Sequence, residues 1–217
     1  EISACLVGSE MCIRDSLQSY DPETDKACGI IGEARVETSK THHSDVRGTR
    51  RVDLMRLSMN YEWLFTIERW VTPSGPHALW LKVYHREEGS DWSLFAEISS
   101  PHHDRILCLA VNPQKNEVIT TDGIGLVKVW QLIEKTSPLN NNEAVSFDAK
   151  YTWTCGHSFV HSEEPATGLS YSSDGTVYAL SNPQSISLWA ADTHTLLHIV
   201  SLPSPDSIVR VKYIFDM

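Results

Sequence analysis

Short apolar or alternating runs of about five to seven residues follow one another from Val52 onward. Turn-forming stretches separate these runs, among them TPSGP, NPQKN, TDGIG and SSDG. A run of this length bounded by turn residues is typical of a β-strand. No stretch keeps a helical period for more than about two turns. The sequence therefore predicts an all-β fold: a sandwich, a barrel or a propeller.

The spacing of the runs repeats, and this repeat favours a propeller. Three segments share one layout in which the third strand ends in an aromatic residue: Tyr84 in LKVY, Trp130 in VKVW and Trp189 in ISLW. The separations are 46 residues (84 to 130) and 59 residues (130 to 189). The first is close to the ~40–45 residues of one propeller blade, and a loop at 134–143 lengthens the second. We expect the three aromatic side chains to pack between blades.

We expect three parts along the chain. Residues 1–16, EISACLVGSEMCIRDS, lack any periodicity and resemble a translated sequencing adaptor, so we expect them to be non-native. Residues 17–51 read as the end of a strand and a long polar loop, with one short strand near 29–36. Residues 52–217 read as a partial propeller of about three four-stranded blades plus an extra strand at 208–214. Rings of this type typically need about 4–8 blades, so we expect three alone to be unstable.

Two segments, 102–131 and 165–192, resemble WD repeats. In the first, ILCLAV and VKVW stand at the first and third strands, with His102 or His103 in the preceding loop. Gln131 and Ala190 replace the Asp that follows Trp in the ideal repeat. We also expect the Asp of the tight turn between the second and third strands to be absent. These departures argue against the buried His–Ser–Asp–Trp hydrogen-bond network of ideal repeats and favour blades held mainly by packing.

The order of the elements resembles the second propeller of the WD repeat-containing protein 75 family. The string Trp153-Thr154-Cys155 after the loop, and WLFTIE at 63–68, carry most of this resemblance. It implies a non-catalytic scaffold of the small-subunit processome, in its t-UTP (UtpA) subcomplex. Such a protein acts in the nucleolus in pre-rRNA processing, small ribosomal subunit biogenesis and rDNA transcription. Tyr84, Trp130, Trp189 and Trp153 then hold structural WD-repeat positions.

The resemblance also implies the partners: other UTP proteins, and pre-rRNA within the complex, with no membrane and no small-molecule substrate. The chain carries 18 Lys and Arg against 28 Asp and Glu, a net charge of −10, which argues against a protein that coats nucleic acid. One local basic cluster, RGTRR, contains Arg47, Arg50 and Arg51. It is either a solvated part of the polar loop or a phosphate contact to pre-rRNA.

We expect no catalytic, cofactor-binding or metal site. The sequence contains neither a nucleotide-binding glycine motif nor a serine-hydrolase elbow. The paired histidines His42-His43 and His102-His103 have no ligands at metal-binding spacing, and His157 and His161 flank an apparent loop. The five cysteines form no C-x-x-C pair, so we expect neither a disulfide framework nor a zinc site.

Two other functions stay open. One is a generic WD-repeat adaptor, such as a ubiquitin-ligase substrate receptor or a coat subunit. The other is a propeller-type enzyme, which would need a cluster of carboxylates or metal ligands at the central channel, and the sequence offers no such pattern.

Overall fold

The computed structural model describes residues 17–21, 26–31, 49–72, 75–87, 90–135, 147–201, 208 and 210–212. The predicted non-native segment 1–16, the His42-His43 pair, Arg47 and most of the loop 134–143 lie outside these residues. The regular elements of the described part are β-strands, apart from one four-residue helix, α1 (Phe147–Lys150). No helix in that part has the length and apolar character needed to cross a membrane.

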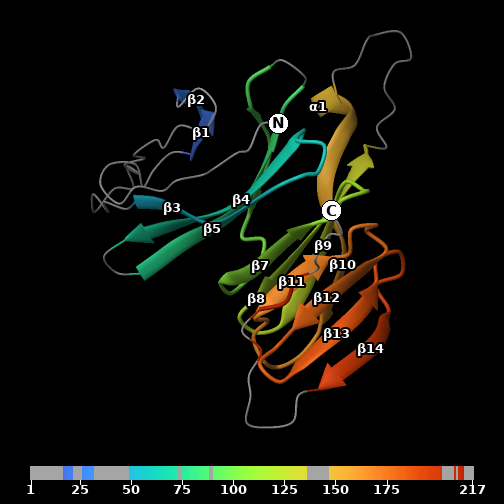
Figure 1. The fold of residues 1–217 in the computed structure, drawn as a ribbon. Coiled ribbons are helices and arrows are strands. Elements are labelled where there is room, and N and C mark those ends of the chain that lie inside the picture. Colours follow the sequence, from blue (N-terminus) through green and yellow to red (C-terminus); the bar gives the residue numbers. More distant parts are fainter. Residues whose placement is uncertain are drawn as a thin grey trace. The chain divides into compact units, whose positions relative to one another are not determined.

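Most of the described strands form three four-stranded antiparallel sheets, in each of which the strands follow one another in chain order (Figure 1). Blade 1 consists of β3 (Thr49–Leu57), β4 (Trp63–Thr72), β5 (Gly75–His85) and β6 (Ser93–Ser99). Blade 2 consists of β7 (Ile106–Val111), β8 (Glu117–Asp122), β9 (Leu126–Glu134) and β10 (Tyr151–Val160). Blade 3 consists of β11 (Gly168–Tyr171), β12 (Val177–Ser181), β13 (Ser185–Ala190) and β14 (Leu196–Ser201). A further hairpin pairs β1 (Leu17–Asp21) with β2 (Lys26–Ile31).

The three blades share a β-bulge at the same place. In each blade the outer strand carries one extra residue beside the third-strand aromatic, so that the pairing register shifts there. The aromatics are Tyr84, Trp130 and Trp189, and the extra residues beside them are Phe95, Gly156 and Leu197. A bulge increases the local twist and bends the outer strand. The repeat inferred from residue spacing is therefore also a repeat of backbone geometry.

Four strand assignments differ from the sequence expectation. The strand expected near 29–36 begins three residues earlier, as β2 from Lys26 to Ile31, and residues 32–36 lie outside the described residues. β10 continues to Val160 rather than ending at Cys155, because the bulge restores the pairing and His157 lies opposite Val129. His157 is thus on a strand and not in a loop. β3 begins at Thr49, so Arg50 lies on a strand as well. No strand is formed at residues 208 and 210–212, and the rest of the expected strand 208–214 lies outside the described residues.

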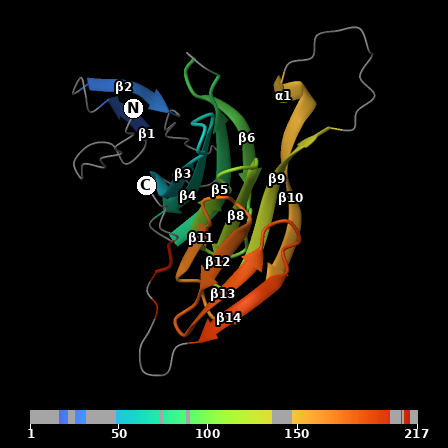
Figure 2. The ribbon, with the colours of Figure 1, turned by 45° about the vertical axis from the view of Figure 1, so that its right-hand side comes forward.

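The chain divides into two compact units, and each has its own core. The first, 1–55 with 61–101, holds most of blade 1, where β4 is buried on both faces along WLFTIE. The second, 56–60 with 102–217, holds blades 2 and 3, which lie side by side in Figures 1 and 2. Val127 and Val129 of blade 2 pack there with Tyr178 and Leu180 of blade 3. Full burial of such a side chain stabilises the fold by roughly 1.5–3 kcal/mol, so the interface between these blades is a true core.

Candidate functional site

A chain of buried hydrogen bonds runs through blade 2 from Trp130 to Asp122. Trp130 Nε1 donates to Thr120 Oγ1 at 2.8 Å, and the same oxygen lies 2.7 Å from His102 Nε2. His102 Nδ1 lies 2.9 Å from Asp122 Oδ2. An ionised carboxylate only accepts, so we assign the ring proton to Nδ1. Nε2 then accepts the hydroxyl proton of Thr120, and each link points the same way along the chain.

The expectation that this network would be missing is wrong. Asp122 is the last residue of β8 and closes the turn to β9, because its Oδ1 accepts from the backbone N–H groups of Ile124 and Leu126 at 3.2 and 2.9 Å. Thr120 supplies the hydroxyl that an ideal repeat takes from Ser. The residue after the tryptophan makes no hydrogen bond in this network, so the network is intact although Gln131 stands there instead of the Asp of an ideal repeat.

The loop histidine of this network is His102, whereas His103 is exposed. Burial lowers the pKa of His102, and the hydrogen bond and charge of Asp122 oppose that shift. The imidazole is therefore held neutral near pH 7, which agrees with the hydrogen-bond directions assigned above.

Blade 3 builds a shorter network from different positions. Trp189 Nε1 donates to Ser187 Oγ at 2.8 Å, and His161 Nε2 lies 3.3 Å from that oxygen. Here the hydroxyl comes from the third strand, two residues before the tryptophan, instead of from the second. Asn182 stands where blade 2 has Asp122, and its Oδ1 accepts from the N–H groups of the next turn at 3.0 and 2.7 Å. The turn is thus closed without a carboxylate.

Blade 1 replaces the network with a buried ion pair. Lys82 Nζ lies 2.9 Å from Glu68 Oε2, and both side chains are less than a tenth exposed. Tyr84 and Thr66 donate their hydroxyl protons to Glu68 Oε1 at 3.3 and 3.2 Å. Burial, together with the Glu68 charge, raises the pKa of Tyr84. The phenol therefore stays protonated and serves as a donor.

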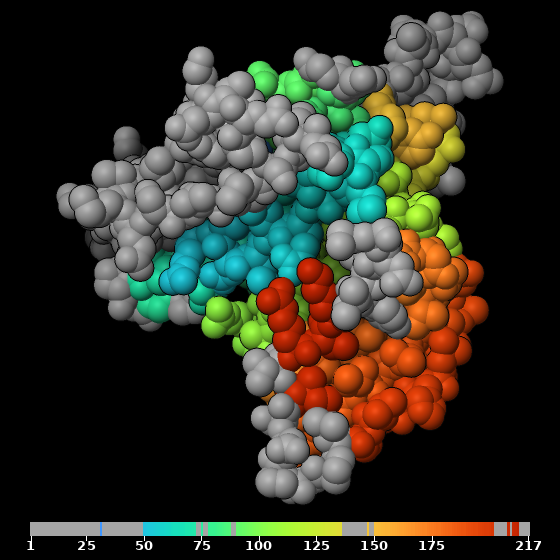
Figure 3. Space-filling model, in the orientation of Figure 1, coloured from blue at the N-terminus to red at the C-terminus, as the bar shows by residue number. Residues whose placement is uncertain are grey.

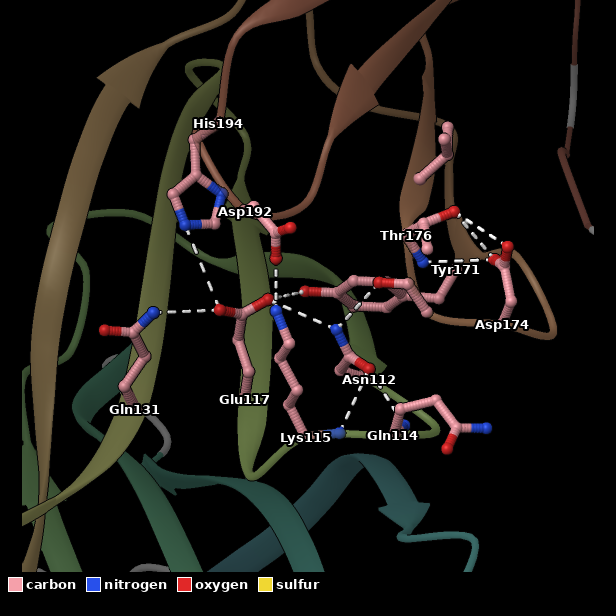
Figure 4. A network of polar contacts seen from close by, with 12 residues as sticks. Asn112, Gln114, Lys115, Glu117, Gln131, Tyr171, Asp174, Thr176, Asp192 and His194 are labelled. Atoms are coloured by element: carbon pink, nitrogen blue, oxygen red, sulfur yellow. Dashed lines mark hydrogen bonds and ion pairs between the residues drawn. The ribbon is translucent and has the colours of Figure 1, made fainter.

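A second network, around Glu117, joins blade 2 to blade 3 (Figure 4). Glu117 opens β8 and is 4% exposed. Tyr171, at the end of β11, donates its hydroxyl proton to Oε1 at 2.6 Å. Gln131 Nε2 donates to Oε2 at 2.9 Å, and Asn112 Nδ2 lies 3.5 Å from Oε1. His194 Nε2 of blade 3 stands 3.9 Å from Oε2. One buried carboxylate is thus surrounded by donors from both blades.

Two further contacts flank this carboxylate at the same end of the blades. Asn112 Nδ2 donates to the carbonyl oxygen of Gly175 at 3.1 Å, which ties the turn after β7 to the turn after β11. Gly175 has φ +69°, and a Cβ there would lie 2.4 Å from Asn112 Oδ1, so only glycine fits. Lys115 and Asp192 form an exposed ion pair across the two blades.

The four structural positions named from the sequence are placed as follows. Tyr84, Trp130 and Trp153 are 3–5% exposed, and Trp189 is half-buried. Trp130 and Trp189 each anchor one of the hydrogen-bond networks, and Tyr84 joins the buried ion pair. Trp153 lies on β10 opposite Leu132. The structure thus places three of the four, Tyr84, Trp130 and Trp153, inside their blades.

The basic residues named from the sequence do not form one patch in the described part of the chain. Arg50 and Arg51 are neighbours on β3, and successive strand residues point to opposite faces. The Arg50 guanidinium lies over the Trp80 ring at 5.2 Å. Arg51 Nε lies 3.5 Å from Asp53, whose carboxylate also accepts two hydrogen bonds from Arg69. Arg47 lies outside the described residues.

Two further chemical candidates, His157 and Cys108, lie in the described part of the chain. No group of three or more His, Cys, Asp and Glu side chains there could hold a metal ion. His157 instead stacks on His194, with ring centroids 5.1 Å apart. Burial raises the pKa of Cys108, which keeps that thiol protonated.

Sequence reasoning missed Thr120 and Glu117. A usable signal existed for the first, since a hydroxyl two residues before an Asp-Gly turn fits a repeat whose Ser is replaced by Thr. No signal in the sequence pointed to Glu117, because a charged residue at the start of a strand usually faces solvent. Its main partner, Tyr171, is 54 residues away in the chain.

Comparison with known proteins gives a consistent result. The family model described as the WD repeat-containing protein 75 second beta-propeller matches residues 34–213. WD repeat-containing protein 75 of Xenopus laevis is 26% identical over 162 residues, which are 69% of this chain and 18% of that protein. The Homo sapiens protein of the same name is 25% identical over 139 residues, 62% of this chain and 16% of that protein. The chain thus spans about a fifth of the length of these relatives.

Two solved structures match the fold. One, titled "Crystal Structure of Mitotic Checkpoint Complex", has a TM-score of 0.55 and 12% identity, and the match covers 90% of this chain and 48% of the other. A second, "Crystal structure of RRP9 WD40 repeats", has a TM-score of 0.51 and 11% identity over 75% of this chain and 44% of the other. These matches confirm the predicted all-β, partial WD-repeat propeller.

Proposed function

Because the chain belongs to the WD repeat-containing protein 75 second β-propeller family, we propose that it is a non-catalytic scaffold of the small-subunit processome. In this role it acts in the nucleolus, in pre-rRNA processing, small ribosomal subunit biogenesis and rDNA transcription. The observation that carries the proposal is the family match over residues 34–213, which takes in all three blades. Since the chain spans only about a fifth of its relatives, the function of the whole protein enters here as part of the proposal.

The described residues support a scaffold on physical grounds. Buried polar groups hold strands together in all three blades: Glu68 pairs with Lys82 in blade 1, Trp130 donates to Thr120 in blade 2, and Glu117 of blade 2 accepts from Tyr171 of blade 3. The chain is acidic, with a net charge of −10, so protein surfaces suit it better as partners than RNA phosphates do. We therefore propose other UTP proteins as the direct partners.

The deciding experiment is affinity purification of the full-length protein that carries this chain, tagged and expressed in its own cells. We expect other UTP subunits and the 5′ external spacer of pre-rRNA to co-purify, and the tagged protein to lie in the nucleolus. Recovery of a ubiquitin ligase or a coat complex without nucleolar proteins would refute the processome role. That result would favour a generic WD-repeat adaptor.

We also propose, as a separate point, that any direct RNA contact uses Arg47, Arg50 and Arg51. Reversing the charge of all three should weaken RNA association and reduce its dependence on salt, since each lost phosphate contact lowers the salt slope by about one. The structure favours a small effect, because Arg50 stacks on Trp80 and Arg51 is near Asp53. An unchanged salt slope would remove the proposal and leave the scaffold role untouched.

A further inference from the structure

The outermost strand of blade 3, β14, exposes every one of its side chains. Four of them are large and aliphatic: Leu196 (46% exposed), Leu197 (56%), Ile199 (49%) and Val200 (47%). They point to both faces of the strand. β14 pairs with β13 on one side, and no described strand pairs with it on the other. The strand lies at the edge of the sheet in Figures 1 and 2, and its orange-red atoms lie on the surface in Figure 3.

The outer strands of the other two blades differ in composition. β6 includes the charged residue Glu97, which reaches Lys82 at 3.6 Å. The exposed middle of β10 is formed by Cys155, Gly156, His157 and Ser158, without a large aliphatic side chain. Natural proteins keep edge strands from pairing with other chains by means of charged residues, proline, short length or β-bulges. β14 carries a bulge at Leu197, but its sequence LLHIVS has neither charge nor proline and all its side chains are exposed, so the regular part of its edge is suited to pairing.

The chemistry of this edge specifies what can bind it. Unpaired backbone N–H and C=O groups along a strand are best satisfied by another extended strand. β14 has no charged residue, so a charged strand beside it would lose hydration without gaining a counter-charge. A second copy of this chain would bring another net charge of −10 to the contact, which opposes self-association. The favoured occupant is thus an uncharged aliphatic strand of a different protein.

We propose that β14 binds such a strand by β-sheet addition, extending blade 3 from four strands to five. Main-chain hydrogen bonds would supply most of the affinity, and Leu197 and Ile199 would contribute side-chain contacts on one face. The inference rests on the scaffold function proposed above, because it names how one partner is held.

The test uses the full-length tagged protein in its own cells, with the photo-crosslinking residue p-benzoylphenylalanine at Val200. Crosslinked peptides are identified by mass spectrometry. We expect a crosslink to an uncharged, aliphatic-rich segment of another subunit. The double substitution L197K/I199K should lower the yield of this crosslink by a factor of about ten or more, and a factor of ten corresponds to about 1.4 kcal/mol of binding free energy. The control is V160K, which makes the same kind of change at a side chain on β10 that is 65% exposed. It should leave the yield unchanged.

A measurement on the unsubstituted protein guards against misfolding of the variants. Amide hydrogen exchange of β14 should be slower in the assembled complex than in the same protein released from it. Equal exchange, or a crosslink only to this chain itself or to a second copy, would overturn the inference. If UTP subunits still co-purify in that case, the scaffold function stands and only the strand addition fails. If the crosslinked aliphatic strand belongs instead to a coat or ubiquitin-ligase subunit, the strand addition stands and the processome role fails.

Discussion

Thr120 is the position at which the hydrogen-bond network of blade 2 can be tested most sharply. Its hydroxyl accepts from Trp130 Nε1 at 2.8 Å and donates to His102 Nε2 at 2.7 Å, and Thr120 itself is 0% exposed. Thr120→Val keeps the shape and removes the hydroxyl. Two buried polar atoms then lose their partner, and each such loss costs about 1–3 kcal/mol. We expect the free energy of unfolding to fall by about 2–6 kcal/mol, a large share of the ~5–15 kcal/mol of an ordinary domain.

The matched control is Thr120→Ser, which keeps the hydroxyl and removes one methyl group. That change should cost about 1 kcal/mol. Equilibrium urea unfolding, followed by tryptophan fluorescence, measures both variants, and equal m-values are needed for the comparison. If Thr120→Val and Thr120→Ser destabilise the protein equally, the hydroxyl carries no net stability and the reasoning from the network is refuted.

Three further predictions concern blades 2 and 3. Tyr171→Phe removes the 2.6 Å hydrogen bond to Glu117 and should lower the free energy of unfolding, measured in urea, by about 1.5–3 kcal/mol. The control Tyr178→Phe loses only a 3.5 Å contact with His194 and should cost clearly less. The reverse order of the two losses would contradict the role of Glu117. Gly125→Ala should lower the free energy of unfolding by about 2 kcal/mol or more, because φ is +79° and the new Cβ would lie 1.8 Å from the carbonyl oxygen of Ser162. The control Gly156→Ala places its Cβ against only the end of the Gln131 side chain, so its loss should stay within about 1 kcal/mol. The third prediction rests on three histidines, one buried and two half-buried, whose pKa is lowered by burial: His102, His161 and His194. The unfolded chain then binds more protons than the folded one, so the stability should decrease as the pH falls through 6.5. A melting temperature that increases as the pH is lowered through 6.5 would contradict the lowered pKa of these histidines.

The architecture of the blades could be read from the sequence because it depends on local signals. Alternating apolar runs, turn residues and the spacing of Tyr84, Trp130 and Trp189 are each visible within one repeat. The bulge beside each aromatic was not visible, since it depends on which residue of a neighbouring strand is skipped. The same limit explains β10: Gly156 looked like the end of a strand, yet the partner strand β9 continues and keeps β10 paired.

The polar networks were harder to predict, for a different physical reason. A hydrogen bond forms wherever a donor and an acceptor atom come close enough in space. The same atom can therefore be supplied from different positions in the sequence of a repeat. Blade 2 takes its hydroxyl from Thr120 on the second strand, and blade 3 takes it from Ser187 on the third. Both oxygens reach the tryptophan because neighbouring strands present side chains on the same face of the sheet. A motif search that expects Ser at one position finds neither.

The buried carboxylate of Glu117 has a consequence for how the chain would come apart. In a repeat protein, the balance between the stability of each unit and the coupling between neighbours decides whether units unfold singly or together. Tyr171 and His194 of blade 3 both face Glu117, so unfolding blade 3 alone removes partners that the carboxylate of blade 2 uses. Blades 2 and 3 should then open as one cooperative unit, and their slowest amide hydrogens should exchange at a common free energy of opening.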